Sequence, residues 1–274
     1  MGWSINLVCG YEYILEVRLF QAEGISPMAR MTNSRFEVIS SIQVASENSW
    51  IDKMFLTFDI DWAHDDILGY TLDLVENRNL AATWFMTHET PLLDRLRANA
   101  SFELGIHPNF NYLLQNDTRN GRSATLVAQK LLDIVPEAKS VRSHSLLQSG
   151  PLLEMFEQMG LTHECNYFIP WNSDINLRPW IPSHSIITRV PHFWEDDVAC
   201  LDGEHHSITE LSNSLGLKVF DFHPIHVFLN TESLDRYELT RPFHNNPKEL
   251  IKHRYDGYGT RNRLLDLLNI REDV

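Results

Sequence analysis

Acidic, histidine and arginine side chains lie at the ends of apolar segments that read as strands. The residues are Asp59, Asp61, His88, His107, Arg142, His144 and His223. In parallel β-α folds the carboxyl ends of the strands meet at one edge, and active sites lie there. We therefore expect these side chains, although remote in sequence, to share one site.

Asp59 and Asp61 form an Asp-Ile-Asp sequence at the end of the first such segment. In an extended strand residues i and i+2 point the same way, so both carboxylates can face one cavity. Two close carboxylates repel each other unless a cation or a proton lies between them. A divalent metal ion satisfies this condition. In the alternative interpretation Asp61 caps the next helix and Asp59 pairs with an arginine.

Imidazole and carboxylate ligands with one open position are typical of catalytic zinc sites. Asp61 and His107 supply two ligands, and the third is either His144 or Asn111, which lies four residues after His107. An amide is a poor zinc ligand compared with imidazole, so we favour His144. The sequence thus predicts one divalent ion, with zinc the expected metal.

Short apolar runs alternate with helical patterns from Met54 onward, which indicates repeated β-α units. The predicted strands are 54–59, 82–87, 102–107, 139–144, 185–190 and 217–223. No Gly-x-Gly-x-x-Gly or Walker-type loop follows any of them, which disfavours an open nucleotide-binding sheet. We expect an α/β fold, namely a seven-stranded, incompletely closed (β/α) barrel over 54–274. Residues 1–53 read as an irregular N-terminal extension of uncertain structure.

The composition limits the partners and the compartment. Twenty-three basic against thirty-seven acidic residues give a net charge of −14, which disfavours nucleic acid and anionic membrane surfaces. No apolar stretch approaches the roughly 20 residues that span a bilayer, so no membrane insertion is expected. The three cysteines form no Cys-x-x-Cys pair, which fits a reducing cytoplasm. The sequence does not indicate an oligomeric state.

Four segments resemble motifs of the polysaccharide deacetylases of the carbohydrate esterase family-four type. They are Thr57-Phe58-Asp59-Ile60-Asp61, Ala82-Thr83-Trp84-Phe85-Met86, Val141-Arg142-Ser143-His144 and Val219-Phe220-Asp221-Phe222-His223. The resemblance runs from about Met54 to the C-terminus and is nearest to a branch associated with surface-polysaccharide biosynthesis. The family's His-x-x-x-His metal motif reads His107-Pro108-Asn109-Phe110-Asn111 here, so one expected ligand has become an amide.

The resemblance implies roles for individual residues. Asp59 would be the general base, held ionised and oriented by Arg142, and His223 would protonate the leaving amine. Asp61 and His107 would be metal ligands, with His144 replacing the missing histidine. His226, three residues beyond His223, is an alternative acid. Predicted substrate-binding residues are Asn111, His88, Trp194 and Asp196, the last two resembling a family motif that supports the catalytic histidine.

These observations predict a metal-dependent hydrolase that removes an N-acyl group, acetyl by resemblance, from an amino sugar of a glycan or glycan precursor. A cytoplasmic location favours a precursor. One alternative keeps the site but changes the substrate to another linear or cyclic amide. A further alternative is a non-catalytic carbohydrate-binding protein derived from a deacetylase. The aromatic segment between Trp171 and Trp194 is expected to discriminate between an open sugar groove and a closed pocket.

Overall fold

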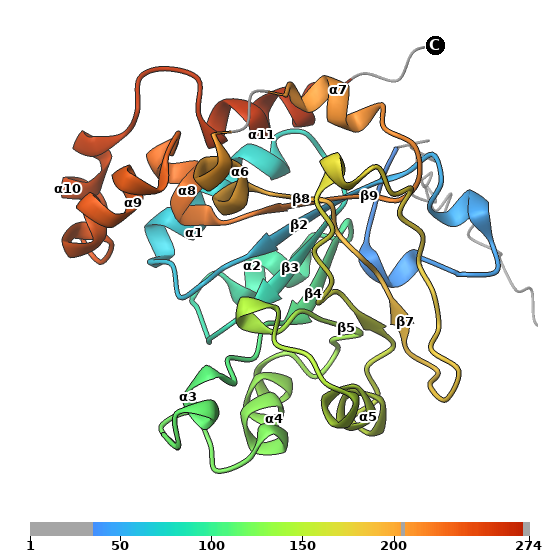
Figure 1. Ribbon diagram of the computed structural model, residues 1–274. Coiled ribbons are helices and arrows are strands. Elements are labelled where there is room, and N and C mark those ends of the chain that lie inside the picture. Colours follow the sequence, from blue (N-terminus) through green and yellow to red (C-terminus); the bar gives the residue numbers. More distant parts are fainter. Residues whose placement is uncertain (1–34, 204–205, 271–274) are drawn as a thin grey trace, which may run out of the picture. The chain divides into compact units, whose positions relative to one another are not determined.

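A curved parallel sheet forms the centre of the protein. The computed structural model describes residues 35–203 and 206–270 (Figure 1). The described part of the sheet has nine strands in the order β7-β6-β5-β4-β3-β2-β9-β8, with β1 beside β2. The strands are β1 (Phe36–Glu37), β2 (Met54–Asp59), β3 (Ala82–Met86), β4 (Phe102–Ile106), β5 (Ser140–Val141), β6 (His163–Glu164), β7 (Thr188–Arg189), β8 (Trp194–Glu195) and β9 (Lys218–Phe222).

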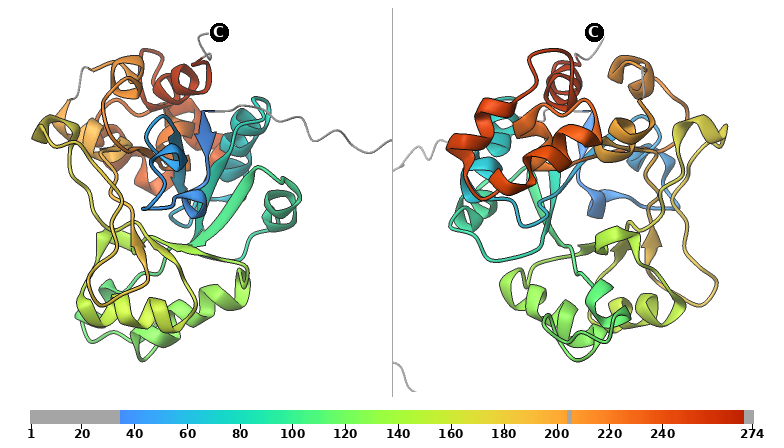
Figure 2. Two further views of the ribbon diagram at one scale, coloured as in Figure 1. Left: turned by 90° about the vertical axis from the view of Figure 1, so that its right-hand side faces the viewer. Right: turned by 60° about the vertical axis from the view of Figure 1, so that its left-hand side comes forward.

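Helices cover the outside of this sheet (Figures 1 and 2). They are α1 (Asp65–Glu76), α2 (Leu93–Ala98), α3 (Asn111–Leu114), α4 (Ala124–Ile134), α5 (Gly150–Gln158), α6 (Asp196–Asp202), α7 (Ile208–Ser212), α8 (Pro224–Leu229), α9 (Leu234–Thr240), α10 (Pro247–Leu250) and α11 (Thr260–Leu268). Helix α8 packs against α1 and α11. None of these helices is long and apolar enough to cross a membrane.

The sheet curls without closing, because β7 and β8 are its two edges and do not pair. The predicted incompletely closed (β/α) barrel is therefore confirmed, although the sheet has more strands than the expected seven. Strands β6 and β8 were not predicted. Each has only two residues, too few for a period-2 pattern, and the pair His163 and Glu164 in β6 is polar.

Burial explains why β2 reads as a continuous apolar segment. It lies between β3 and β9, and every one of its residues is buried. Strands covered on both faces have near-continuous hydrophobic sequences. Helix α1, which follows, buries the predicted face of Leu68, Leu72 and Val75 and begins with the acidic residues Asp65 and Asp66. Such acidic residues interact favourably with the amino end of a helix.

The described part of the predicted N-terminal extension packs on the barrel. Phe36, Ile39, Ile42 and Trp50 are buried in the same hydrophobic core as the central strands. His163 Nε2 lies 3.0 Å from the carbonyl oxygen of Ile42, which ties this segment to β6. The prediction for residues 1–34 lies outside the described residues.

Candidate active site

A tight turn after β2 brings both aspartates to the site. The strand ends at Asp59, and the next residues include Asp61 with φ of 38° and Trp62 with φ of 54°. The assumption of an extended strand as far as Asp61 was therefore wrong. Non-glycine residues in this region cost about 1–3 kcal/mol each. The backbone N–H of Trp62 donates to Thr87 Oγ1 over 3.1 Å, which helps to hold the turn.

Two histidines reach the same point from neighbouring loops. His107 directly follows β4, and its backbone N–H donates to the carbonyl of Met86 at 2.8 Å. His144 follows β5, and its backbone N–H donates to the carbonyl of Pro108 at 3.0 Å. The loop that carries His144 is thus bonded to the loop that carries His107.

Asp61, His107 and His144 bring three ligand atoms into a nearly equilateral triangle. Asp61 Oδ1 lies 3.3 Å from His107 Nε2 and 3.3 Å from His144 Nδ1. The two nitrogens are 3.2 Å apart. Among the described residues these three form one of two groups that could hold a metal ion, the other being Asp59, Asp221 and His223. The structure therefore brings together the three residues that the sequence suggested as ligands.

The triangle fits a divalent ion. Zinc–nitrogen bonds of 2.0–2.1 Å in a tetrahedron place the ligand atoms about 3.3–3.4 Å apart, close to the separations found here. Asp61 Oδ1 is buried and accepts no hydrogen bond within the described part of the chain. His107 Nδ1 makes no hydrogen bond within the described residues, but it lies 3.4 Å from Asp59 Oδ2, and a carboxylate commonly stands on this side of a ligating histidine. The residues present thus match a three-ligand site with an open position.

Neighbouring charges shift the pKa values of Asp61 and His107. Burial alone would raise the pKa of Asp61, but the imidazoles of His107 and His144, each 3.3 Å from Oδ1, outweigh it and hold that pKa well below its usual range. Burial would lower the pKa of His107, whereas the charges of Asp59 and Asp61 raise it. The net pKa of His107 is raised because the two carboxylates prevail.

Arg142 lies beneath the triangle and binds two carboxylates. Its side chain is fully buried, and Nη1 donates to Asp59 Oδ1 at 3.0 Å and to Thr57 Oγ1 at 3.0 Å. The same nitrogen donates to Asp221 in β9. Burial raises the pKa of Asp221 to about 7, in spite of the opposing charge of Arg142. Asp221 was not predicted as a site residue.

His223 faces the triangle from the end of β9. Its Nδ1 lies 2.7 Å from Asp196 Oδ1, and its backbone N–H donates to Asp196 Oδ2 at 2.9 Å. Its Nε2 lies 3.7 Å from Asp61 Oδ2. Burial would lower the pKa of His223, but the charge of Asp196 raises it well above its usual range.

The chain is similar to known proteins in sequence and in fold. The family model described as WbmS-like polysaccharide deacetylase matches residues 56–241. The chain belongs to this deacetylase family. A crystal structure from Bordetella bronchiseptica, described as a polysaccharide deacetylase involved in O-antigen biosynthesis, is 47% identical with a TM-score of 0.81. The match covers 85% of this chain and 97% of that chain.

A second solved structure is more distant. The family 4 carbohydrate esterase from Streptomyces lividans, in complex with acetate, is 12% identical with a TM-score of 0.42. That match covers 78% of this chain and 86% of that chain. No curated protein matches the chain significantly.

Other predicted site residues of this deacetylase-family chain lie around the triangle. The side-chain amide of Asn111 donates to Ser145 Oγ at 2.9 Å, so its recorded contact is with that hydroxyl. His88 Nδ1 lies 2.8 Å from Thr87 Oγ1. His226 Nδ1 lies 3.1 Å from Thr231 Oγ1, and burial lowers the pKa of His226. Of the two candidate acids, His223 is the one that has a carboxylate partner at hydrogen-bonding distance within the described part of the chain.

The two residues of the predicted aspartate-tryptophan motif differ in their surroundings. Asp196 is fully buried and bonded to His223. Trp194 is 1% exposed, and its ring centroid lies 4.8 Å from that of Phe222. Packing covers nearly all of the indole, so its burial favours a core role and gives no support to the predicted contact with substrate.

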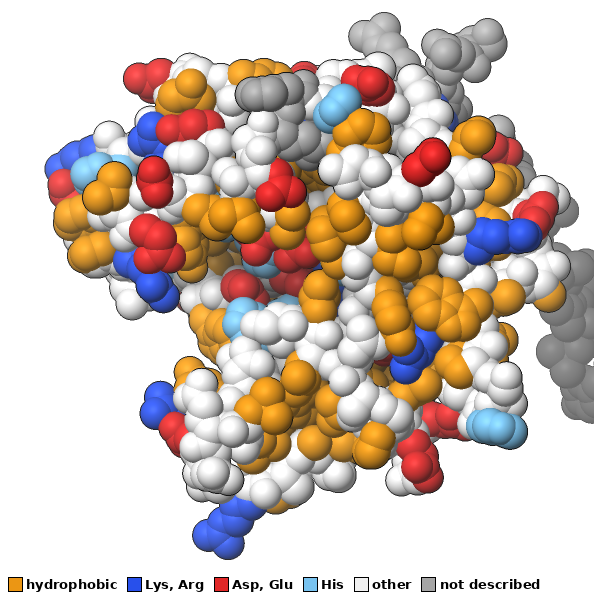
Figure 3. Space-filling model, in the orientation of Figure 1, with side chains coloured by type: hydrophobic (Ala, Val, Ile, Leu, Met, Phe, Trp, Pro, Cys, Tyr) orange, Lys and Arg blue, Asp and Glu red, His pale blue; other side chains and the backbone are white. Residues whose placement is uncertain are grey.

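Asp61, His144 and His223 open into a cavity of about 420 Å³, here called the histidine cavity. It is lined by Asp61, Trp62, Ala63, His64, His144, Asp197, His223, Ile225, His226, Leu234, Tyr237, Glu238, His244 and Asn245. Figure 3 shows acidic and histidine side chains on the floor of a hollow near the centre of this face. The cavity is large enough for a ligand of several rings or groups, since pockets of about 300–1,000 Å³ hold small molecules.

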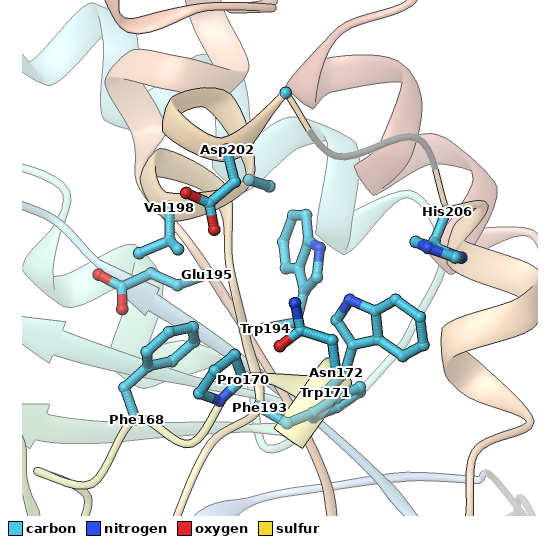
Figure 4. Close-up of a pocket in the computed structure, with 12 residues that line it drawn as sticks. Phe168, Pro170, Trp171, Asn172, Phe193, Trp194, Glu195, Val198, Asp202 and His206 are labelled. Atoms are coloured by element: carbon cyan, nitrogen blue, oxygen red, sulfur yellow. The ribbon is translucent and has the colours of Figure 1, made fainter. Parts of the chain in front are cut away.

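The aromatic segment between Trp171 and Trp194 contributes to a separate cavity of about 260 Å³ (Figure 4). Phe168, Trp171 and Phe193 line it together with the carboxylates of Glu195 and Asp202. None of its lining residues belongs to the ligand triangle. The segment expected to discriminate between an open sugar groove and a closed pocket therefore lines a different cavity from the one beside the triangle.

Proposed function

We propose that this protein is a metal-dependent hydrolase that removes an N-acyl group, acetyl by family resemblance, from an amino sugar of a glycan or glycan precursor. The observation that carries the proposal is the triangle of Asp61, His107 and His144, with separations of 3.2–3.3 Å. The pair of Asp59 with Arg142 and the pair of His223 with Asp196 flank this triangle.

Asp61, His107 and His144 would hold the ion, with zinc the expected metal because its ligands are imidazole and carboxylate. A divalent ion bound there supplies Lewis-acid polarisation of the carbonyl and lowers the pKa of water. The two proton transfers of the reaction are assigned to side chains of the protein.

Asp59 is suited to accept a proton from the attacking water. Its Oδ1 is occupied by Arg142, at 3.0 Å, while Oδ2 points toward His107. The guanidinium offsets the negative charge of the buried carboxylate and fixes its orientation. A carboxylate oriented beside the triangle is the kind of group that serves as a general base.

His223 is suited to protonate the leaving nitrogen. Asp196 accepts from Nδ1–H, which leaves Nε2 directed toward Asp61 Oδ2 and the histidine cavity. The charge of Asp196 favours the protonated ring and so supplies a proton donor. Base and acid thus approach the triangle from different strands, β2 and β9.

The substrate class follows from family membership and from the 47%-identical relative, whose description names O-antigen biosynthesis. This supports a surface glycan or its precursor as the substrate. The cytoplasmic location expected from the sequence stays a prediction. The site chemistry, a polarised carbonyl between a base and an acid, suits amide hydrolysis.

Asp59→Asn tests the proposal, because asparagine keeps the shape but cannot take up a proton. We expect release of amine from N-acetylated amino sugars to fall by about 10²–10⁴-fold when variant and wild type are compared at equal, saturating zinc. Asp94→Asn, at an exposed position on α2, is the matched control and should retain full turnover. Undiminished turnover in Asp59→Asn would rule out the assigned base.

A further inference from the structure

Trp62 separates the histidine cavity from another cavity beside the same triangle. This one has a volume of about 240 Å³ and is here called the α4 cavity. It is lined by Trp62, Thr87, His88, Glu89, His107, Asn109, Asn120, Val127, Lys130, Leu131 and Ile134. Asp61 and His144 line the histidine cavity, whereas His107 lines the α4 cavity. The triangle therefore lies between two cavities, and the indole of Trp62 borders both.

An amide substrate has two substituents that leave its carbonyl carbon in different directions, the nitrogen and the acyl chain. His223, the proton donor for nitrogen, lines the histidine cavity and not the α4 cavity. On the proposed function, on which this inference rests, the nitrogen and its sugar occupy the histidine cavity. The acyl chain then points away from His223, toward His107 and the α4 cavity.

The α4 cavity is larger than an acetyl group requires. An apolar cavity of about 150 Å³ is sufficient to hold benzene. The methyl group of acetyl would leave most of the 240 Å³ unfilled. A chain of three or four carbons would fill more of it and would bury additional methylene groups, each of which improves binding.

The lining also indicates the kind of chain. Val127 and Leu131 are buried residues of α4 and, with Ile134, provide an apolar wall opposite polar groups of the loops. His88, Asn109 and Asn120 can hydrogen-bond to a hydroxyl group on the chain. Lys130 and Glu89 are exposed and mark the solvent side.

We propose that the α4 cavity is the acyl-binding subsite and that it accepts N-acyl groups of three or four carbons, hydroxylated chains included, in preference to acetyl. Trp62 divides the acyl side from the sugar side. The strained turn at Asp61 and Trp62 thus places a metal ligand and this dividing ring next to each other.

The test measures amine release by the full-length, zinc-loaded protein from glucosamine and galactosamine carrying N-acetyl, N-propionyl, N-butyryl or N-3-hydroxybutyryl groups. We expect kcat/KM for the four-carbon compounds to exceed that for acetyl by roughly three- to tenfold, because butyryl buries two more methylene groups and 3-hydroxybutyryl buries one methylene and gains a hydrogen-bonding hydroxyl. The disaccharide N,N′-diacetylchitobiose, compared with N-acetylglucosamine, shows whether a second sugar raises kcat/KM in the same way as a longer acyl chain.

Ile134→Trp narrows the α4 cavity and should lower the butyryl-to-acetyl ratio of kcat/KM at least fivefold. Lys130→Trp, at the exposed rim, repeats the test at a position where the fold is not at risk. Leu126→Trp is the control, since Leu126 is exposed on the same helix and does not line the cavity.

Acetyl as the fastest group, or an unchanged ratio in both Ile134→Trp and Lys130→Trp, overturns the subsite while leaving the proposed function standing. If kcat/KM does not change with acyl length but is higher for the disaccharide, the α4 cavity binds a second sugar, and the acyl-binding subsite is overturned equally. Absence of hydrolysis for every N-acyl sugar removes the proposed function itself, and the subsite with it.

Discussion

His107 Nε2 and His144 Nδ1 lie 3.2 Å apart, although the residues are 37 positions apart in the sequence. The second histidine of the family's His-x-x-x-His motif is Asn111 in this chain. The position of His144 beside Asp61 and His107 provides a third imidazole or carboxylate group at the same point. Where the motif's second histidine is replaced by Asn111, the imidazole of His144 on the next loop thus lies in position to serve as the third metal ligand.

His144→Ala should therefore reduce zinc affinity by more than about 100-fold, because a ligand contributes more than the residues that orient it. Elemental analysis after dialysis against a dilute chelator measures the effect. Asn111→Ala should retain the metal, and His184→Ala, at an exposed position, serves as the control. Loss of metal in Asn111→Ala with retention in His144→Ala would reverse the assignment.

Asp196→Asn should lower kcat by about 10²–10⁴-fold with little change in KM or metal content. The amide cannot stabilise the protonated ring of His223, and the comparable change in a catalytic triad has an effect of this size. His226→Gln should keep at least a third of wild-type kcat, because that ring has no carboxylate partner at hydrogen-bonding distance among the described residues. A larger loss in His226→Gln than in Asp196→Asn would make His226 the acid.

Arg142→Met should destabilise the fold by about 3–5 kcal/mol, since it leaves the buried carboxylates of Asp59 and Asp221 without their cation. Urea unfolding followed by circular dichroism gives this difference. Arg178→Met is the comparison, because its ion pair with Glu47 is exposed and contributes less than about 1 kcal/mol. Equal stability of the two variants would contradict a structural role for the Arg142 network.

The contribution of His163 to stability should fall as the pH drops from about 7 to 5. Burial lowers the pKa of His163 in the folded protein, so the unfolded chain, with an ordinary pKa of about 6.5, binds the proton more readily. The contribution of His163 to the free energy of unfolding therefore rises with pH across this range. His163→Gln should flatten the dependence, which urea midpoints at several pH values will measure. An unchanged slope in His163→Gln, with His184→Gln as control, would exclude this contribution.

The site residues that the sequence revealed share one property, their place at the end of a strand. Asp59, His107 and His223 could be found because a long apolar strand of five or six residues precedes each of them. Asp221 was not predicted as a site residue because it lies inside a strand and not at its end. The available signal was an aspartate between Phe220 and Phe222, which in a buried strand requires a cationic partner.

Features set by tertiary contacts could not be predicted. The turn at Asp61 and Trp62 depends on Thr87, a residue of the next β-α loop, and local sequence gives no indication of two consecutive non-glycine residues with positive φ. The burial of Trp194 depends on β8 pairing with β9, and a two-residue strand carries too little pattern to predict that pairing.

X-ray anomalous scattering from crystals grown with zinc locates the bound ion directly. We expect one strong peak at about 2.0–2.2 Å from Asp61 Oδ1, His107 Nε2 and His144 Nδ1 together. A zinc peak elsewhere in the chain, with these three atoms bound to no ion in protein that still hydrolyses N-acyl sugars, would contradict this ligand assignment.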